Sequence, residues 1–141
     1  MVDKRHWSGL IAALVLAGCA SQGDVGEPCG EVSTFYQPPE TQNLYKVVVT
    51  RIDDDNVISK PNYQLAPGTY QLRLVELIDD PRLSVSLRNR GYKELTLTVK
   101  AGTRYHLAAR FNTDKRFQGP SREYWDPVVW RESTTECRMK P

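Results

Sequence analysis

The sequence lacks long apolar stretches, has little histidine, and shows no helical spacing after residue 43. Its apolar segment 10–16 is too short to span a bilayer, which takes roughly 20 apolar residues. Histidine occurs only 2 times, and the chain has neither a Cys-x-x-Cys pair nor a Gly-x-Ser-x-Gly turn. The acidic run 53–55 lacks the alternating ligands and the glycine of a calcium loop. The sequence therefore predicts no metal site, no cofactor and no catalytic residues.

The first 22 residues have the layout of a secretory signal. A basic start precedes the apolar segment, and small residues close it. The stretch Leu16-Ala17-Gly18-Cys19 resembles the lipobox of bacterial lipoproteins, which implies cleavage before Cys19 and attachment of a lipid to its thiol. In that family an aspartate after the cysteine favours the inner membrane, whereas Ala20 follows here. We expect a lipid-anchored protein of the outer membrane, on its periplasmic face; the alternative is a buried helix in which Cys19 is a small apolar residue.

The chain has 3 cysteines, and their places in the sequence divide them. With Cys19 lipidated, Cys29 and Cys137 remain as an even pair in an oxidising compartment, where such pairs form disulfides. A redox-active thiol and a metal site are the alternatives, but only His106 remains in the mature chain to support a metal site. The sequence thus predicts a structural disulfide between the two ends of the folded part.

From residue 44 onward the pattern is that of strands. Apolar and polar residues alternate with a period of two, and turn residues recur every 8 to 12 positions or so, which is typical of a sandwich or barrel. Segment 20–43, rich in Gly, Gln, Ser, Glu and Pro, reads as a tether. The expected strands are 45–52, 70–74, 83–88, 95–99, 105–111 and 128–130.

Three stretches carry a second resemblance: LAPGTYQLRL, RGYKELTLTV and AGTRYHLAARF. Over residues 57–112 their order of turns and strands is similar to PEGA-type domains and their transthyretin-like relatives, although only Ala66-Pro67-Gly68 matches the motif that gives the family its name. The resemblance implies a small, mostly antiparallel all-β sandwich that binds or scaffolds and catalyses nothing. The expected organisation is a signal peptide 1–18, a lipidated tether 19–43 and a β-sandwich domain 44–141.

Positive charge is concentrated in the middle of the chain. Residues 82–122 hold 10 basic and 2 acidic side chains, whereas residues 19–81 hold 4 basic and 10 acidic ones. Strand parity directs Arg88, Arg104 and Arg110 outward, and arginine suits carboxylates and phosphates. One interpretation is a binding face for an anionic group. The other is a solvated surface that balances the acidic first half.

Aromatic residues near the C-terminus form the second candidate site. In REYWDPVVW, Trp125 and Trp130 together with Tyr124 are an aromatic platform in one interpretation and core residues in the other, and Pro127 is expected to interrupt the strand. His106 falls by parity beside Arg104 and is expected to be a surface residue whose pKa the neighbouring cations lower.

Three functional hypotheses follow. The first is a non-catalytic envelope lipoprotein that binds or scaffolds other envelope proteins. The second is a binder of an anionic envelope polymer or glycan such as peptidoglycan, which would use Arg88, Arg104, Arg110, Trp125 and Trp130. The third, an enzyme, has no catalytic constellation to support it. Nucleic acid is not an expected partner because export removes the domain from it.

Overall fold

The computed structural model describes residues 26–114 and 122–140. The expected signal peptide 1–18, the lipidated Cys19, and Lys115 and Arg116 in the basic segment therefore lie outside the described residues. Within the described ranges the chain is an all-β sandwich, as the sequence predicts, and its two 3-10 turns are short: η2 (Glu40–Gln42) and η3 (Leu87–Asn89).

The first sheet is built around β8 (Thr103–Phe111). On one side β8 pairs with β9 (Trp125–Thr134); its other side is shared by β1 (Gly30–Ser33) and β2 (Leu44–Tyr45). β5 (Asn62–Leu65) extends the sheet beyond β1. The β1–β8 pair is parallel and the other pairs are antiparallel. Because β8 has neighbours on both sides, its side chains occupy the middle of this sheet.

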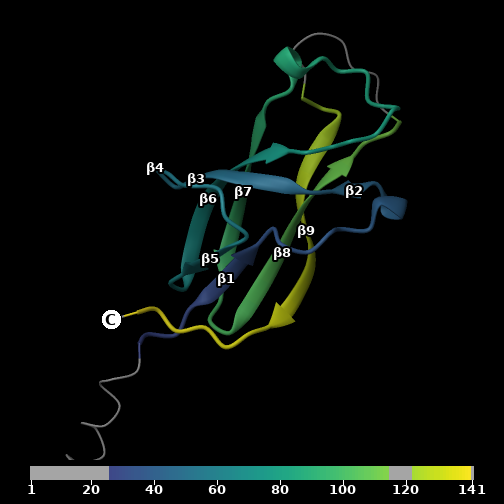
Figure 1. Cartoon of the computed structure of the whole chain (residues 1–141). Helices are drawn as coiled ribbons and strands as arrows, with labels where there is room; N and C mark the ends of the chain where they lie inside the picture. Colours follow the sequence, from purple (N-terminus) through teal and green to yellow (C-terminus); the bar gives the residue numbers. More distant parts are fainter. Residues whose placement is uncertain (1–25, 115–121, 141) are drawn as a thin grey trace, which may run out of the picture.

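The second sheet has the strand order β4-β3-β6-β7, and every pair in it is antiparallel. Its strands are β3 (Val47–Ile52), β4 (Asp55–Asn56), β6 (Gly68–Glu76) and β7 (Tyr92–Val99). Figure 1 shows β6 and β7 in one layer and β8 and β9 in the other.

One hydrophobic core lies between the sheets, and the period-two pattern predicts its members well. On β8 the inward residues Tyr105, Leu107, Ala109 and Phe111 are at most 4% exposed. From the second sheet the alternating residues of β6 pack against the same core cluster, Leu72 being 0% exposed. Burial of a large apolar side chain such as Leu72, Leu107 or Phe111 stabilises the folded state by about 1.5–3 kcal/mol. Because Leu107 and Phe111 of β8 must face the core, the residues that alternate with them face outward.

The sandwich begins earlier in the chain than residue 44. β1, which falls in the expected tether 19–43, is buried along its whole length between β5 and β8. Its sequence, GEVS, has one β-branched residue and therefore no alternation signal. Gly30 is required there because an added Cβ would lie 2.4 Å from Cγ1 of Val99 and 2.5 Å from the backbone oxygen of Lys100. The tether is shorter, and the folded domain longer, than the sequence predicts.

The expected strand 83–88 is wrong. This segment pairs with no described strand and ends in η3. Leu83 and Val85 pack partly buried against the core, whereas Leu87 is 80% exposed. The segment is a loop that covers one end of the core. Its apolar residues alternate because every second side chain points toward the core, as in a strand. Figure 1 shows this loop at the end of the sandwich opposite to the C-terminus.

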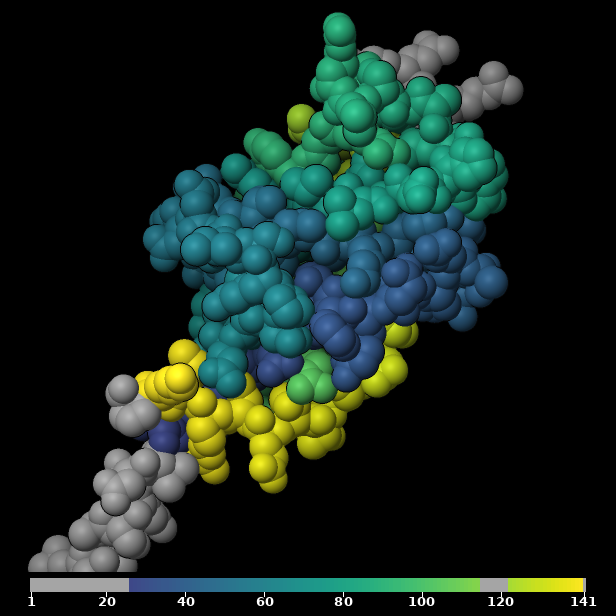
Figure 2. Space-filling model, viewed as in Figure 1, coloured from purple at the N-terminus to yellow at the C-terminus, as the bar shows by residue number. Residues whose placement is uncertain are grey.

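A disulfide joins Cys29 to Cys137, as the sequence predicts, across a separation of 108 residues. The backbone N–H of Cys29 also donates to the carbonyl of Cys137 (3.1 Å), and Met139 N–H donates to the carbonyl of Glu27 (2.8 Å). The first and last described segments therefore run together at one end of the sandwich. In Figure 2 the C-terminal segment, in yellow, covers this end, and the green loop around η3 forms the other.

Candidate functional site

The three arginines of the expected basic face do not converge. Arg104 donates from Nε to Glu31 (2.6 Å) near the start of β8, and Arg110 pairs with Asp126 (3.2 Å) near the end of that strand. They are six positions apart along β8, which is about 20 Å at 3.3 Å per residue. Arg88 lies in η3 and makes no ion pair with a described residue.

Most of the basic segment is neutralised within the fold. Five of its eight described basic residues pair with carboxylates, and three of the pairs reach back to acids of the acidic first half. The pairs are Arg82–Asp80, Arg90–Glu76, Lys93–Asp126, Arg104–Glu31 and Arg110–Asp126. The structure therefore favours the interpretation in which these charges balance the acidic half.

Glu76 shows how deep this pairing goes. Glu76 is 3% exposed; its carboxylate accepts hydrogen bonds from Ile78 N–H (2.9 Å) and from the Tyr124 hydroxyl, and it forms an ion pair with Arg90 Nε at 3.4 Å. Burial, and then the bond to the Glu76 carboxylate, raise the pKa of Tyr124 well above its usual range. Tyr124 is therefore part of the interior and not of an exposed platform.

The two tryptophans of the expected platform point to opposite sides of the sheet. Trp125 is 0% exposed in the core, whereas Trp130 lies partly exposed on the outer face. The pairing of β8 with β9 shifts by one residue beside His106, and Trp130 is the extra residue at that bulge. Pro127 does not interrupt β9, because an edge strand tolerates a residue without an N–H.

The outer face of the first sheet carries an aromatic cluster, which we call the aromatic face: Phe35, Tyr36, Trp130 and Arg131 around His106. Phe35 is 56% and Tyr36 44% exposed, and their ring centroids are 5.1 Å apart. The His106 ring lies 5.3 Å from that of Tyr36 and 5.8 Å from that of Trp130. The Arg131 guanidinium lies 5.8 Å from each of those two aromatic rings. No carboxylate of a described residue pairs with it.

His106 is buried rather than exposed, which corrects the expectation of a surface residue. Its 1% exposure results from the cover that Tyr36 and Trp130 provide. Burial lowers the pKa of His106, and the charges of Arg131 and Arg104 lower it further. The sequence predicted this direction, although it named only the cations as the cause.

The His106 Nε2 atom lies 2.8 Å from the hydroxyl of Ser133, a distance that suits a nucleophile and its base. A triad also needs an acid that orients the second ring nitrogen. The buried Nδ1 of His106 has no hydrogen-bond partner among the described residues. The pair is therefore an outer-face hydrogen bond without the third member of a triad.

Sequence reasoning missed Phe35, Tyr36 and Arg131. The first two fall in the expected tether, and Arg131 follows the expected end of the last strand at residue 130. The available signal was the adjacent Phe-Tyr pair, which is unusual in an otherwise polar linker.

Comparison of the chain with models of protein families, with curated proteins and with solved structures finds no match. The resemblances to bacterial lipoproteins and to PEGA-type domains thus stay predictions. Across residues 26–114 and 122–140, no helix has the length and apolarity needed to cross a membrane, and no group of three or more His, Cys, Asp or Glu side chains is placed to hold a metal ion.

Proposed function

We propose that this chain is a lipoprotein anchored through Cys19 to the periplasmic face of the outer membrane, and that its sandwich, which is not catalytic, binds another envelope protein through the aromatic face. The exposed pair Phe35 and Tyr36, beside Trp130 and Arg131, carries the proposal. Aromatic residues and arginine dominate the binding energy of protein interfaces. Trp130 and Arg131 are mounted on β9, whereas Phe35 and Tyr36 lie in the segment after β1, where the Tyr36 ring lies against His106 of β8.

Arg131 favours a protein partner over an anionic polymer. The cations expected to hold a polymer, Arg104 and Arg110, already pair with Glu31 and Asp126. The free guanidinium of Arg131 is a single charge among rings, which suits one carboxylate next to an apolar side chain. Binding of a glycan such as peptidoglycan is the alternative, and the partly exposed rings of Tyr36 and Trp130 favour it.

The binding test uses a photo-crosslinking residue at position 36 of the lipidated protein in cells. We expect an adduct with one defined protein, and we expect Arg131→Glu to abolish it. A crosslinker at Leu87, which lies in η3 and is 80% exposed, is the control and should give no such adduct. If the protein instead co-sediments with purified sacculi, and Tyr36→Ala abolishes this co-sedimentation, the glycan alternative is favoured. No adduct and no sedimentation would refute a binding role for this face.

The anchor is tested separately by Cys19→Ser. The variant should leave the membrane fraction or remain unprocessed, because it lacks the thiol that carries the lipid. Unchanged membrane fractionation would contradict the lipoprotein assignment.

A further inference from the structure

The first sheet ends on one side at β5, and the free edge of that strand presents backbone groups without partners. The backbone N–H of Thr34 donates to the carbonyl of Pro61 (2.8 Å), which extends the antiparallel β1–β5 ladder by one hydrogen-bonded pair. In such a ladder these pairs alternate with pairs whose backbone groups point away from each other. The register with β1 places Asn62 and Gln64 in pairs of the second kind. Their N–H and C=O groups therefore point to the free edge.

The described part of the chain leaves these groups open. β5 pairs with β1 alone, and no backbone group of another described residue bonds to the backbone of Asn62 or Gln64. Both residues are exposed. The strand, NYQL, contains no proline, no charged residue and no bulge, the usual features that keep an edge from pairing. Two N–H groups and two carbonyls are thus open to an added strand.

The long edges on the other side of the sandwich are protected. On β9, Pro127 has no N–H, and the bulge at Trp130 interrupts the ladder. The β7 and β9 strands contact each other, and Lys93 of β7 forms an ion pair with Asp126 of β9 (3.2 Å). β5 therefore differs from these two strands in offering an edge that nothing described covers or interrupts.

A groove of about 520 Å³ lies along the outer face of β1 and β5. The residues that line it are Glu31, Lys60, Asn62, Gln64, Met139 and Lys140. Lys60 precedes β5, whereas Met139 donates to the carbonyl of Glu27, which precedes β1. Because β1 and β5 are antiparallel, Lys60 and Lys140 lie at opposite ends of the groove. A strand added to β5 directs every second side chain to this face, so the groove can receive them.

The charges of this groove favour an acidic side chain at the Lys60 end. Glu31, the one carboxylate among the lining residues, is already paired with Arg104 (2.6 Å). Lys60 is exposed and forms no ion pair with a described residue. The exposed acids Glu27 and Glu136 lie beside Cys29 and Cys137, at the end of β1 away from Lys60. A carboxylate on an added strand therefore meets an unpaired cation there.

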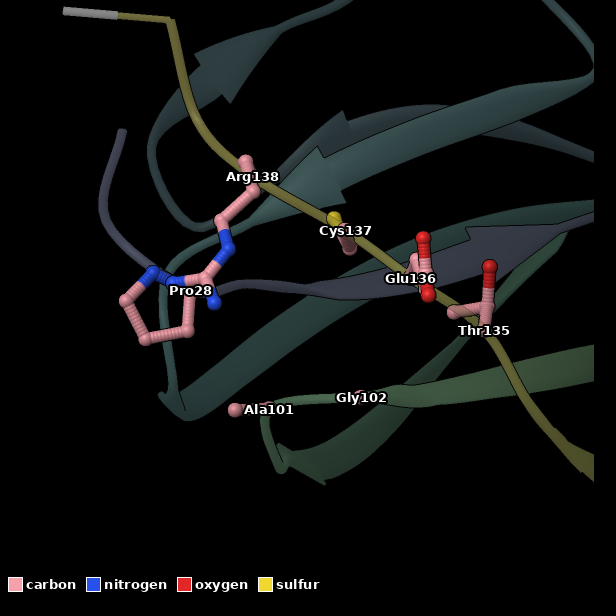
Figure 3. A pocket seen from close by; sticks show the side chains of 7 residues that line it. All are labelled: Pro28, Ala101, Gly102, Thr135, Glu136, Cys137 and Arg138. Atoms are coloured by element: carbon pink, nitrogen blue, oxygen red, sulfur yellow. The ribbon is translucent and has the colours of Figure 1, made fainter. Parts of the chain in front are cut away.

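A second groove, of about 440 Å³, lies beside the C-terminal segment but has no free strand edge. Figure 3 shows its lining residues, with the side chain of Arg138 extended along Pro28. The backbone there is paired, because Pro28 and Arg138 form an antiparallel bridge and Thr135 N–H donates to the carbonyl of Gly102 (2.9 Å). Only the groove beside β5 combines a cavity for side chains with open backbone groups.

We propose that the free edge of β5 binds an extended segment of another protein, which adds to the first sheet as a further strand and carries an acidic side chain that pairs with Lys60. In this mode of recognition the main-chain hydrogen bonds supply affinity, and pockets for alternate side chains supply specificity. A second copy of this chain is not the occupant, because pairing two β5 strands brings two cationic grooves side by side. The inference needs neither the lipid anchor nor the aromatic face.

The test titrates the isotope-labelled, lipid-free Cys19→Ser protein with a capped peptide, Thr-Glu-Val-Glu-Val-Thr, and with a counterpart in which lysine replaces both glutamates. We expect the acidic peptide at millimolar concentration to shift the NMR signals of the Asn62 and Gln64 amides and to slow their exchange with solvent. The lysine peptide should bind at least about two-fold more weakly, as the loss of an exposed ion pair predicts. The amide of Leu87, in η3, is the control and should not shift.

Matched variants sharpen the result. Gln64→Pro removes one outward N–H, which an edge strand tolerates, and should abolish binding, whereas Gln64→Ala keeps that N–H and should bind. Lys60→Glu should remove the preference for the acidic peptide. The emission of Trp125 verifies that each variant is folded; if Gln64→Pro does not fold, the effect of Lys60→Glu decides.

Three outcomes would overturn the proposal. The first is no shift of the Asn62 and Gln64 amides with either peptide, and the second is equal binding by the folded Gln64→Pro and Gln64→Ala variants. The third is a dimer of the protein that Gln64→Pro abolishes, which would assign this edge to a second copy. Equal affinity for the two peptides would overturn the pairing with Lys60. These results are independent of the crosslink at position 36, so they leave the proposed function to its own test.

Discussion

Removing the disulfide between Cys29 and Cys137 should lower the melting temperature substantially. The bond closes a loop of 108 residues. In the chain-entropy model a loop of that length stabilises the folded state by about 4.8 kcal/mol at room temperature, by restricting the unfolded chain. Measured values for native disulfides are often smaller, about 2–4 kcal/mol.

The expected shift follows from the size of the folded part. Residues 26–140 unfold with an entropy of about 0.24 kcal/mol/K, at roughly 2.1 cal/mol/K per residue. Dividing a stabilisation of about 2 to 4.8 kcal/mol by this entropy gives a drop in melting temperature of about 8 to 20 °C. The backbone bonds of Cys29 to Cys137 and of Met139 to Glu27 persist without the bond between the sulfurs, so the reduced chain should still fold.

The assay follows the emission of Trp125, which is 0% exposed and should shift to the red when the core opens. The protein carries Cys19→Ser, so that it has no lipid and needs no detergent, and it keeps both Cys29 and Cys137. Reduction should be carried out on unfolded protein, because Cys29 is 0% and Cys137 6% exposed, and the protein then refolded. The control is the double variant Cys29→Ser/Cys137→Ser, which should melt like the reduced protein and ignore the reductant. Equal melting of oxidised and reduced protein would refute the reasoning.

Three further variants probe packing, protonation and charge. Gly30→Ala should lower the free energy of unfolding by about 2 kcal/mol or more, measured by urea titration, because the added methyl meets Val99 and a backbone oxygen. The lowered pKa of His106 keeps the folded state neutral while the unfolded chain, with a pKa near 6.5, takes up a proton. Stability should therefore fall as the pH drops below 6.5 toward the folded-state pKa, and His106→Gln should flatten that part of the pH profile. Arg104→Glu should destabilise the fold by about 3–5 kcal/mol in the same titration, because it leaves the 9% exposed Glu31 unpaired beside a like charge.

Each of these variants has a control or a contradicting outcome. Gly91→Ala should be tolerated, because the atoms nearest to its added methyl belong to the exposed, flexible side chain of Arg122, which can move. Arg88→Glu should leave stability unchanged, so an equal loss in Arg88→Glu and Arg104→Glu would mean that net charge, not the pair with Glu31, matters. A pH profile that His106→Gln leaves unaltered below neutral pH would contradict the role given to burial.

β3, β6 and β7 were predictable, because each alternates between a core face and an outer face, and β8 keeps a clear period of two although its outward residues His106 and Ala108 are buried as well. β4 was not predictable, because both of its residues are exposed. β1 was not: it is buried on both faces, has four residues, and forms only because β5 and β8 flank it. Such a strand depends on partners far away in the sequence, and its own side chains carry no pattern. Segment 83–88 failed in the opposite way, since Leu83 and Val85 alternate to cover the core without any strand to pair with.

The candidate site shows a similar limit. The pairing of Cys29 with Cys137 followed from counting cysteines. The odd spacing of Trp125 and Trp130 puts them on opposite faces of a continuous strand, and only the expected interruption at Pro127, which the structure does not show, prevented that assignment. Strand parity placed His106 on the outer face correctly. Strand parity could not predict that His106 is buried, because the ring that covers it, Tyr36, comes from a segment without a periodic pattern.

The charge asymmetry along the sequence has its explanation in the parallel contact between β1 and β8. That contact brings Glu31 of the acidic half beside Arg104 of the basic half, 73 positions later. Pairs of this kind convert an asymmetry along the chain into local neutrality on the folded surface. Unpaired cations are therefore more informative about binding than total charge, and Arg131 is one that remains among the aromatic rings. If charge reversal at Arg131 abolishes partner binding while charge reversal at the exposed, unpaired Arg88 does not, binding depends on the aromatic face and not on the total charge.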